Sequence, residues 1–354
     1  LKDRTIIAMT SPIVISLILW SFSLSSAATL QVPKGYKTIQ EAIDKSGKGD
    51  IVLVEAGTYP EVLSLKTGVT VKSQGSETEH TDFTAAKRTI ISSPGHQAAI
   101  IQGADQAILD GFTLEDKQTG FNYSVSRSGV LINGQSQTIS NCLIGNLAYD
   151  GIIISGPHPD SEALIYHNVI FNNQGSGVKC QSRAKTGIIQ NQIFGNEKSG
   201  IENNTGTRTK VIGNRIYKNL IDGVMNTTAK PVIKGNDIFE NGLNGIGLQS
   251  GSQGIIMKNL IFDNAQAGVG LRSSAVATVW ENKIYGNMIG VGCLDLGNVK
   301  IESNEIFKNR RIGIGLMGCS GRPVTIINNH FHDNGFMPIS PNPGCQLVQD
   351  GNRF

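Results

Sequence analysis

The stretch GNRIYKNLIDGV, residues 213–224, is one copy of a sequence motif that occurs about nine times along the chain. All copies but the last have an Asn, an aliphatic residue two positions later, usually an aromatic residue next, a second Asn, and then Gly followed by Ile or Val. The first Asn of each copy is Asn141, Asn168, Asn191, Asn214, Asn236, Asn259, Asn282, Asn304 or Asn329. Most copies are about 22 to 23 residues apart, a period typical of solenoids built from stacked repeats.

The residues after each repeated Gly alternate as they do in a β-strand. Ile or Val follows the Gly in every copy but the last, and the residue two positions further on is also mostly apolar. A helical repeat would need longer runs with a 3.6-residue period, and the leucine framework of leucine-rich repeats is missing. The period fits three short strands and three turns per coil, with successive coils about 4.8 Å apart. The sequence therefore predicts an all-β fold: a single-stranded, right-handed parallel β-helix solenoid.

The repeated polar and aromatic positions have structural interpretations in such a fold. An Asn amide both donates and accepts hydrogen bonds, so identical side chains can bond up and down a stack. We predict a structural ladder of Asn168, Asn191, Asn214, Asn236, Asn259, Asn282 and Asn304. We also predict a stacked column of Phe171, Phe194, Tyr217, Phe239, Phe262, Tyr285 and Phe307.

The first 28 residues have the pattern of a secretory signal peptide. Lys2 and Arg4 precede an apolar run over residues 13–20, and small residues follow it. This order predicts a signal peptide over residues 1–28 and an exported protein, extracellular or periplasmic, without an integral membrane span after cleavage. An uncleaved anchor is the alternative.

Residues 29–354 are predicted to form one β-helix domain. Thr38 and Glu41 have the spacing of a capping box, which predicts a short helix that covers the N-terminal end of the coil. The regular coils are expected over about 129–334, and a C-terminal cap over about 335–354, where the period is lost.

Two segments carry a resemblance to known families. The segment TIQEAIDKSGKGDIVLVEAGTYPE, residues 38–61, resembles the entry of the pectin-lyase-like superfamily, and the repeats over 141–334 resemble parallel β-helix repeats of the NosD type. The resemblance implies a right-handed parallel β-helix that uses the outer face of one stacked sheet. Lyases, hydrolases, esterases, epimerases and non-enzymes share this scaffold. The NosD resemblance implies copper handling.

The outward positions of the strand after each Gly form a polar strip. Its predicted members are Lys179, Gln181, Glu202, Asn204, Thr227, Gln249 and Arg272. Amides and hydroxyls can bond sugar hydroxyls, while Lys179 and Arg272 can attract uronate carboxylates. Glu202 is expected to be the one carboxylate of the strip, without the pair of a glycosidase or the cluster of a calcium-dependent lyase. A solvated strand face is the alternative interpretation.

The longest repeat interval contains a candidate catalytic loop. AYDGIIISGPHPDSEALIYHN, residues 148–168, adds about four residues, and extra residues in a solenoid usually form a loop on one face. Its Asp150, His158 and Asp160 could provide an acid, a base or a weak metal site near the polar strip, and we take His158, Asp160 and Lys179 as candidate catalytic residues. The run from residue 157 to 160 is similar to the Asp-Pro-His-Asp signature of alginate epimerases but lacks its first Asp. A surface loop without a catalytic role is the alternative.

The remaining features narrow the function. The net charge is +3 without a basic patch, which argues against binding of nucleic acid. We also expect the protein to be a monomer. Cys319 and Cys345, about one coil apart, are candidates for a disulfide. No metal site is predicted, because His330 and His332 alternate on one short strand as a solvated edge would; calcium would be a cofactor only for a lyase.

Three functions remain open. The first is an exported β-helix protein that binds or processes polysaccharide, acidic polysaccharide included, along the polar strip; if it is an enzyme, we expect a lyase, hydrolase or epimerase. The second is a non-catalytic envelope or surface scaffold. The third is a NosD-like accessory protein for metal maturation.

Overall fold

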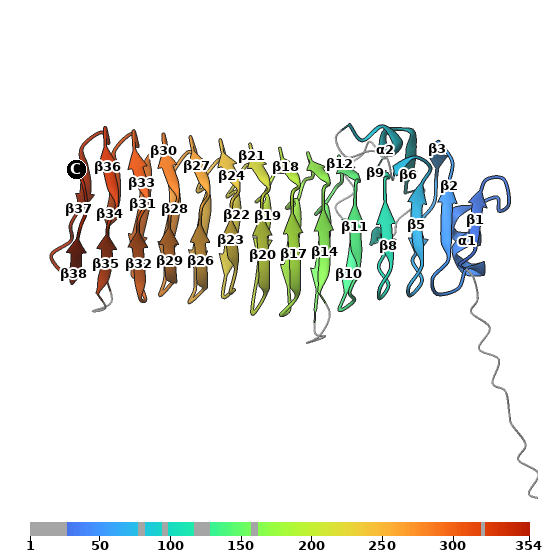
Figure 1. The fold of residues 1–354 in the computed structure, drawn as a ribbon, viewed down its shortest axis with the longest axis horizontal. Coiled ribbons are helices and arrows are strands. Elements are labelled where there is room, and N and C mark those ends of the chain that lie inside the picture. The colour runs from blue at the N-terminus through green and yellow to red at the C-terminus, as the bar shows by residue number, and fades with distance from the viewer. Residues whose placement is uncertain (1–26, 77–81, 94–97, 117–127, 157–161, 320–322) are drawn as a thin grey trace, which may run out of the picture.

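A computed structural model describes residues 27–76, 82–93, 98–116, 128–156, 162–319 and 323–354. The chain winds through about 13 turns of a right-handed parallel β-helix, which forms a long rod (Figure 1). The predicted fold class is therefore confirmed. The predicted signal peptide lies almost entirely outside the described residues, and within them no helix has the length and apolar character to cross a membrane.

Three parallel sheets run along the rod, and each regular coil contributes one strand to each sheet. Sheet A consists, in spatial order, of β1 (Thr29–Val32), β2 (Ile51–Val54), β5 (Thr70–Ser73), β8 (Ile108–Asp110), β11 (Thr138–Ser140), β14 (Ala163–Tyr166), β17 (Lys185–Ile189), β20 (Arg208–Ile212), β23 (Val232–Lys234), β26 (Gln253–Met257), β29 (Val276–Trp280), β32 (Val299–Glu302), β35 (Val324–Ile327) and β38 (Leu347–Asp350). Sheet B consists of β3 (Gly57–Tyr59), β6 (Thr89–Ser92), β9 (Thr113–Glu115), β12 (Leu143–Gly145), β15 (Val169–Phe171), β18 (Gln192–Phe194), β21 (Arg215–Tyr217), β24 (Asp237–Phe239), β27 (Leu260–Phe262), β30 (Lys283–Tyr285), β33 (Glu305–Phe307) and β36 (His330–His332). Sheet C consists of β4 (Leu63–Ser64), β7 (Ala99–Gln102), β10 (Ser128–Asn133), β13 (Ile152–Ser155), β16 (Val178–Gln181), β19 (Ile201–Asn203), β22 (Val224–Thr227), β25 (Ile246–Gln249), β28 (Ala267–Arg272), β31 (Ile289–Leu294), β34 (Ile312–Leu316) and β37 (Met337–Ser340).

The core is a set of aliphatic columns inside the rod. Each strand alternates inward and outward side chains, and the residues after the repeated Gly, such as Val178 and Ile201, pair in register and are fully buried. The three free cysteines, Cys142, Cys180 and Cys293, also point into this core and are buried. Their thiols fill space between aliphatic neighbours.

Asn side chains form two lines of hydrogen bonds along the rod. In the first line, Asn168 Nδ2 donates to Asn191 Oδ1 at 3.0 Å, and Asn236 Nδ2 donates to Asn259 Oδ1 at 2.9 Å. The second line was not predicted as a ladder and consists of Asn173, Asn196, Asn219, Asn241, Asn264, Asn287, Asn309 and Asn334. These amides occupy the turns on either side of each sheet B strand, where they satisfy buried backbone groups that would otherwise lack partners.

The predicted aromatic column is present on the outer face of sheet B. Neighbouring rings from Phe171 to Phe307 stack with centroids 4.7 to 5.7 Å apart. His332 continues the column, with its ring 4.6 Å from that of Phe307. Stacking of this kind stabilises the register of adjacent coils.

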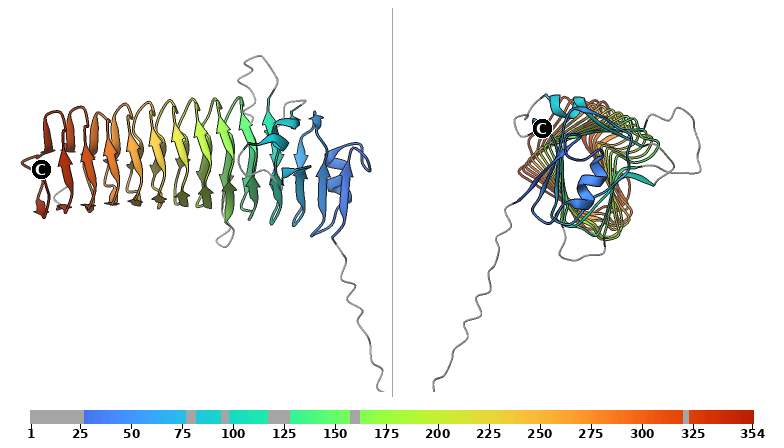
Figure 2. Two further views of the ribbon diagram at one scale, coloured as in Figure 1. Left: turned by 45° about the horizontal axis from the view of Figure 1, so that its top comes forward. Right: turned by 90° about the vertical axis from the view of Figure 1, so that its right-hand side faces the viewer.

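The two ends of the rod differ. The predicted N-terminal helix is α1 (Ile39–Lys45), which lies across the first coils (Figure 2) and buries Ile39, Ala42 and Ile43. A second helix, α2 (Thr84–Arg88), lies beside β6 and β9. At the other end, the segment expected as a cap still adds β37 to sheet C and β38 to sheet A. The predicted disulfide between Cys319 and Cys345 ties this segment to the coil before it.

Candidate functional site

The outer face of sheet C changes character along the rod. Two residues after each repeated Gly, the register aligns Lys179 with Glu202 and then with Met225. The same column continues as glycine for four coils: Gly247, Gly270, Gly292 and Gly315. A charged section therefore passes into a section whose floor carries no side chains.

Glu202 and Lys179 form an ion pair at the charged section. Lys179 Nζ lies 3.4 Å from Glu202 Oε1, and both side chains are mostly buried, at 18% and 21% exposure. Asn204 Nδ2 donates to Glu202 Oε1 at 2.8 Å, and Ser176 Oγ donates to Oε2 at 2.8 Å. Burial alone would raise the pKa of Glu202, but the bonds from Asn204, Ser176 and Lys179 outweigh it, so that pKa is lowered. The carboxylate is held ionised.

A second carboxyl group, that of Asp150, lies beneath the ion pair, buried below the outer face that carries Glu202. Asp150 is fully buried, and its Oδ1 accepts a bond of 2.6 Å from the Ser176 backbone N–H. Within the described residues, its buried Oδ2 has no hydrogen-bond partner. Burial raises the pKa of Asp150, an effect that the Ser176 bond and Lys179 only partly oppose. Two carboxyl groups of one site therefore have pKa values shifted in opposite directions.

Lys179 lacks the property that a general base needs. Burial acts to lower its pKa, but Glu202, Asp150 and Tyr149 outweigh burial, so the pKa of Lys179 is raised. A lysine base requires a lowered pKa. In this structure Lys179 is a fixed positive charge.

A second buried acid, Asp222, was not predicted from the sequence as part of the site. Its Oδ1 accepts from the backbone N–H and the side-chain Nδ2 of Asn244, at 2.8 and 3.0 Å. Its Oδ2 points at the bare Gly247, where an added Cβ would lie 2.8 Å away. Burial raises the pKa of Asp222, and Arg272 partly counteracts this effect. A signal existed, since Asp150 and Asp222 each directly precede a repeated Gly.

The rest of the strip lies along β16 to β28. Gln181 is half-buried beside the ion pair, and Gln249 Nε2 donates to Thr227 Oγ1 at 3.0 Å. Arg272 is exposed at the end of β28. These five strands span about 19 Å at the usual strand spacing.

An open groove follows the strip over the glycine column. Its volume is about 270 Å³, and its lining includes Gly270, Gly292, Arg272, Met288, Leu294 and Met317. The glycines form the floor, and the longer side chains of the adjacent column and turns form the walls. Because Arg272 belongs to both the strip and the groove, the two form one continuous surface.

The predicted catalytic loop lies only partly within the described residues. His158 and Asp160 lie outside the described residues. The chain leaves β13 at Gly156, whose N–H donates to the carbonyl oxygen of Gln181 at 3.2 Å. The loop therefore begins beside the polar strip.

The described residues supply few donors for a metal. On the strip, both oxygens of Glu202 already accept hydrogen bonds, and Asp150 and Asp222 are buried, so the site lacks the open carboxylate cluster that calcium requires. The described cysteines are buried or joined in the disulfide, which removes soft ligands. One group of histidines and a carboxylate, Glu305, His330 and His332, lies elsewhere, on sheet B.

Comparison with known proteins identifies the family. The sequence profile described as right handed beta helix region matches residues 121–225 and 221–353, so the chain belongs to this family. Its fold is that of the pectin-lyase-like superfamily. A search of curated protein sequences found no match.

Several solved structures have the same fold at low sequence identity. The A-module of mannuronan C-5 epimerase AlgE6 from Azotobacter vinelandii superposes with a TM-score of 0.69 and 16% identity, covering 89% of this chain and 93% of that one. The catalytic unit of the GH87 α-1,3-glucanase from Streptomyces thermodiastaticus gives 0.70 and 14%, covering 93% and 70%. Pectate lyase Pel9A gives 0.53 and 14%, covering 93% and 80%. At these identities the likeness establishes the fold alone.

Proposed function

We propose that this protein binds a polysaccharide along the outer face of sheet C. The observation that carries the proposal is the continuous surface from the Lys179–Glu202 ion pair, through Gln249 and Arg272, into the glycine-floored groove. The epimerase, glucanase and lyase with this fold are named as enzymes of polysaccharide chemistry, which supports the proposal by analogy.

A repeating surface suits a repeating polymer. Successive coils present equivalent side-chain positions about 4.8 Å apart, so a chain lying along the rod meets protein groups at a regular spacing. Hydroxyl and amide groups, such as those of Thr227 and Gln249, can bond sugar hydroxyls. The exposed Arg272 can bond a uronate carboxylate in a bidentate manner. We therefore favour an acidic polysaccharide.

Processing of the bound chain is the second candidate. It is favoured by the opposite pKa shifts of Asp150 and Glu202, an arrangement found where acid and base roles are divided. Because Asp150 is fully buried, we assign it a positioning role beneath Lys179. His158 and Asp160 are then the candidate groups for proton transfer in a lyase, hydrolase or epimerase. Without such chemistry, the same surface would serve a non-catalytic envelope scaffold.

We further propose that the protein works outside the cytoplasm. The basic and apolar pattern of residues 1–28 favours export. The disulfide between Cys319 and Cys345 also suits an oxidising compartment. Extracellular or periplasmic polysaccharides would be accessible there.

The binding proposal is tested by affinity electrophoresis and calorimetry with polymannuronate, polygalacturonate and a neutral glucan, with and without calcium. We expect saturable binding to a uronate polymer, weakened at least tenfold in the double variant Gln249→Ala with Arg272→Ala. Arg208→Ala is the matched control, because Arg208 is also exposed but lies on sheet A. Binding to none of the polymers, or equal binding by the double variant, would overturn the proposal.

Processing is tested separately by mass spectrometry and NMR of polymers incubated with the protein. Shortened, unsaturated or epimerised chains would establish an enzyme. In that case we expect His158→Ala or Asp160→Ala to abolish the product while binding persists. Unchanged polymers would leave binding as the function.

A further inference from the structure

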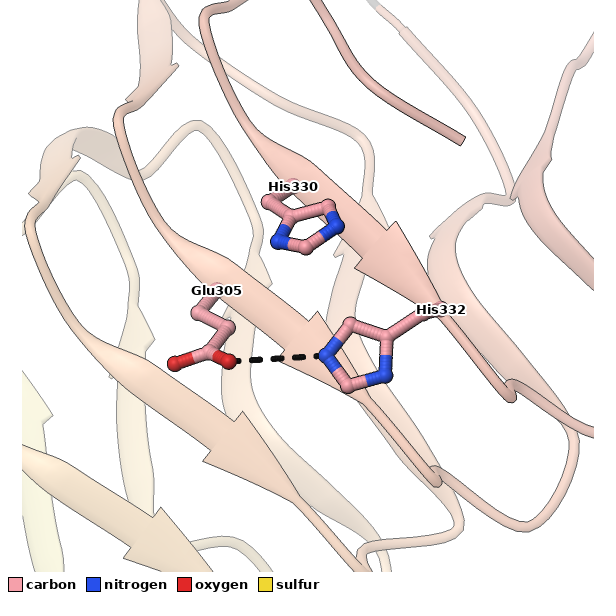
Figure 3. Close-up of side chains that lie close together, drawn as sticks. All are labelled: Glu305, His330 and His332. Carbon is pink, nitrogen blue, oxygen red and sulfur yellow. Dashed lines mark hydrogen bonds and ion pairs between the residues drawn. The ribbon is translucent and has the colours of Figure 1, made fainter.

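Three side chains on the last coils of sheet B bring nitrogen and oxygen donors together (Figure 3). Glu305 begins β33, and His330 and His332 lie on the neighbouring strand β36. Parallel pairing places Glu305 opposite His330, and Phe307 opposite His332. Because Phe331 points into the core, both histidines project from the outer face. One ligand atom from each of the three groups lies within 4.8 Å of the others.

His332 is already oriented as a metal ligand would be. Its ring stacks on Phe307 with centroids 4.6 Å apart, and its Nδ1 lies 3.1 Å from Asp333 Oδ2. A carboxylate oxygen only accepts, so Nδ1 carries the hydrogen of this bond and Nε2 of the neutral ring keeps its lone pair. A carboxylate on the far nitrogen is the usual support of a metal-bound histidine.

The lone pair of His332 faces another acceptor. Its Nε2 lies 3.4 Å from Glu305 Oε1, so two electron-rich atoms meet unless a proton or a cation lies between them. In a tetrahedral zinc site with bonds of about 2.0–2.2 Å, two ligand atoms are about 3.4 Å apart. The observed spacing therefore equals one edge of such a site. The exposed ring of His330 can rotate to supply the third donor.

The remaining oxygen of Glu305 is held by a lysine. Lys283 Nζ lies 2.9 Å from Glu305 Oε2, which leaves Oε1 directed at the histidines. The ion pair with Lys283 thus fixes the carboxylate in the direction of the site.

We propose that Glu305, His330 and His332 bind a divalent transition-metal ion of the Zn²⁺ class. Two imidazoles and one carboxylate suit zinc and its neighbours, whereas calcium and magnesium prefer oxygen ligands. Water would complete the coordination from the solvent side. The ion joins β33 to β36 and thereby fastens the last regular coil to the one before it.

The test is isothermal titration of the tag-free full-length protein with ZnCl₂, followed by Co²⁺ absorption spectroscopy to report tetrahedral coordination. We expect one site per chain, at least tenfold weaker in His330→Ala, His332→Ala and Glu305→Gln. Glu240→Gln is the matched control, because Glu240 also pairs with a lysine, Lys218, at 3.6 Å but belongs to no such group among the residues that the structure describes. It should bind Zn²⁺ as the unaltered protein does.

A stability readout separates ligand loss from misfolding. His330 is exposed, so His330→Ala should retain the melting temperature of the metal-free protein. Excess Zn²⁺ should raise the melting temperature of the unaltered protein but not that of His330→Ala. Absence of saturable Zn²⁺ binding, or equal binding by all three ligand variants, would overturn the proposal.

Discussion

Replacing Asn236 with Leu should break both the ladder and the backbone contacts that depend on it. Asn236 Oδ1 accepts from Asn214 N and Nδ2 at 2.8 and 2.9 Å, and its Nδ2 donates to Val211 O and Asn259 Oδ1, both at 2.9 Å. Leucine has the same number of side-chain heavy atoms but makes none of these bonds. The backbone N–H of Asn214 and one hydrogen of its Nδ2, which keeps its bond to Ile188 O, then stay buried without partners at about 1–3 kcal/mol each. Allowing for the gained apolar burial, we expect a loss of about 1–4 kcal/mol in the free energy of unfolding.

The assay is equilibrium urea unfolding followed by far-ultraviolet circular dichroism. The matched control is Asn298→Leu, which makes the same change at an exposed position. Because coils interact mainly with their neighbours, hydrogen exchange should also increase first in β21 and β24, which flank the lost amide. If Asn236→Leu and Asn298→Leu unfold at the same urea concentration, the stabilising role of the ladder is refuted.

Three further predictions follow from the surface and the ends of the rod. Gly292→Leu should fold normally, because its Cβ would lie 3.7 Å from the nearest atom, in Ala267, but should fill the groove and weaken glycan binding at least tenfold; unchanged binding would show that the glycan does not use it. Glu202→Gln should lower the free energy of unfolding by about 1–2 kcal/mol at pH 7. Because the pKa of Glu202 in the folded protein lies below the usual 4.5, the stability difference between the two proteins should shrink as the pH falls below 4.5. Thermal melts from pH 7 to pH 3 measure this difference, and a constant difference would contradict the role assigned to the ionised Glu202. Cys319→Ala should lower the stability of the C-terminal coil by up to about 3 kcal/mol, seen as faster hydrogen exchange in β37 and β38, whereas equal exchange would show that the disulfide adds no stability.

The fold was predictable because every sequence repeat forms the same contacts with the repeats next to it. Once Asn191 and Asn214 are known to occupy equivalent turns, the neighbouring columns follow by counting, including the aromatic stack through Tyr217. The pairing of Cys319 with Cys345 follows in the same way, since 26 residues separate them. Where one repeat departs from the motif, the alignment of the other repeats still fixes its register.

The buried acid Asp222 was harder to predict because its position varies in residue type. Asp150 occupies the same position, but other equivalent positions hold Ser176, Ser199 and Asn244, so the alignment gives only a weak chemical pattern. Its carboxyl points along the rod axis toward the next coil, where Gly247 leaves room. The direction of the carboxyl group therefore depends on residues of two neighbouring coils, and no motif within a single coil predicts it.

The cluster of Glu305, His330 and His332 on β33 and β36 was not predicted from the sequence for a related reason. The histidines alternate visibly in the sequence, but Glu305 joins them across an interval of 25 residues, in place of the usual 22 or 23. The orientation of His332 also depends on the ring of Phe307 in the previous coil. Register between coils, and not local spacing, brings these donors together.

The Asn ladder also makes the length of the rod adjustable in whole units. Every interior amide receives a bond from one side and gives an equivalent bond to the other, so any two coils offer each other matching partners. Removing residues 236–258 would join Gly235 to Asn259 and leave Asn214 to donate to Asn259 instead. The rod would shorten by about 4.8 Å with both amide lines unbroken. Duplication or loss of single coils can therefore change how many sugar units the surface contacts without requiring a new core.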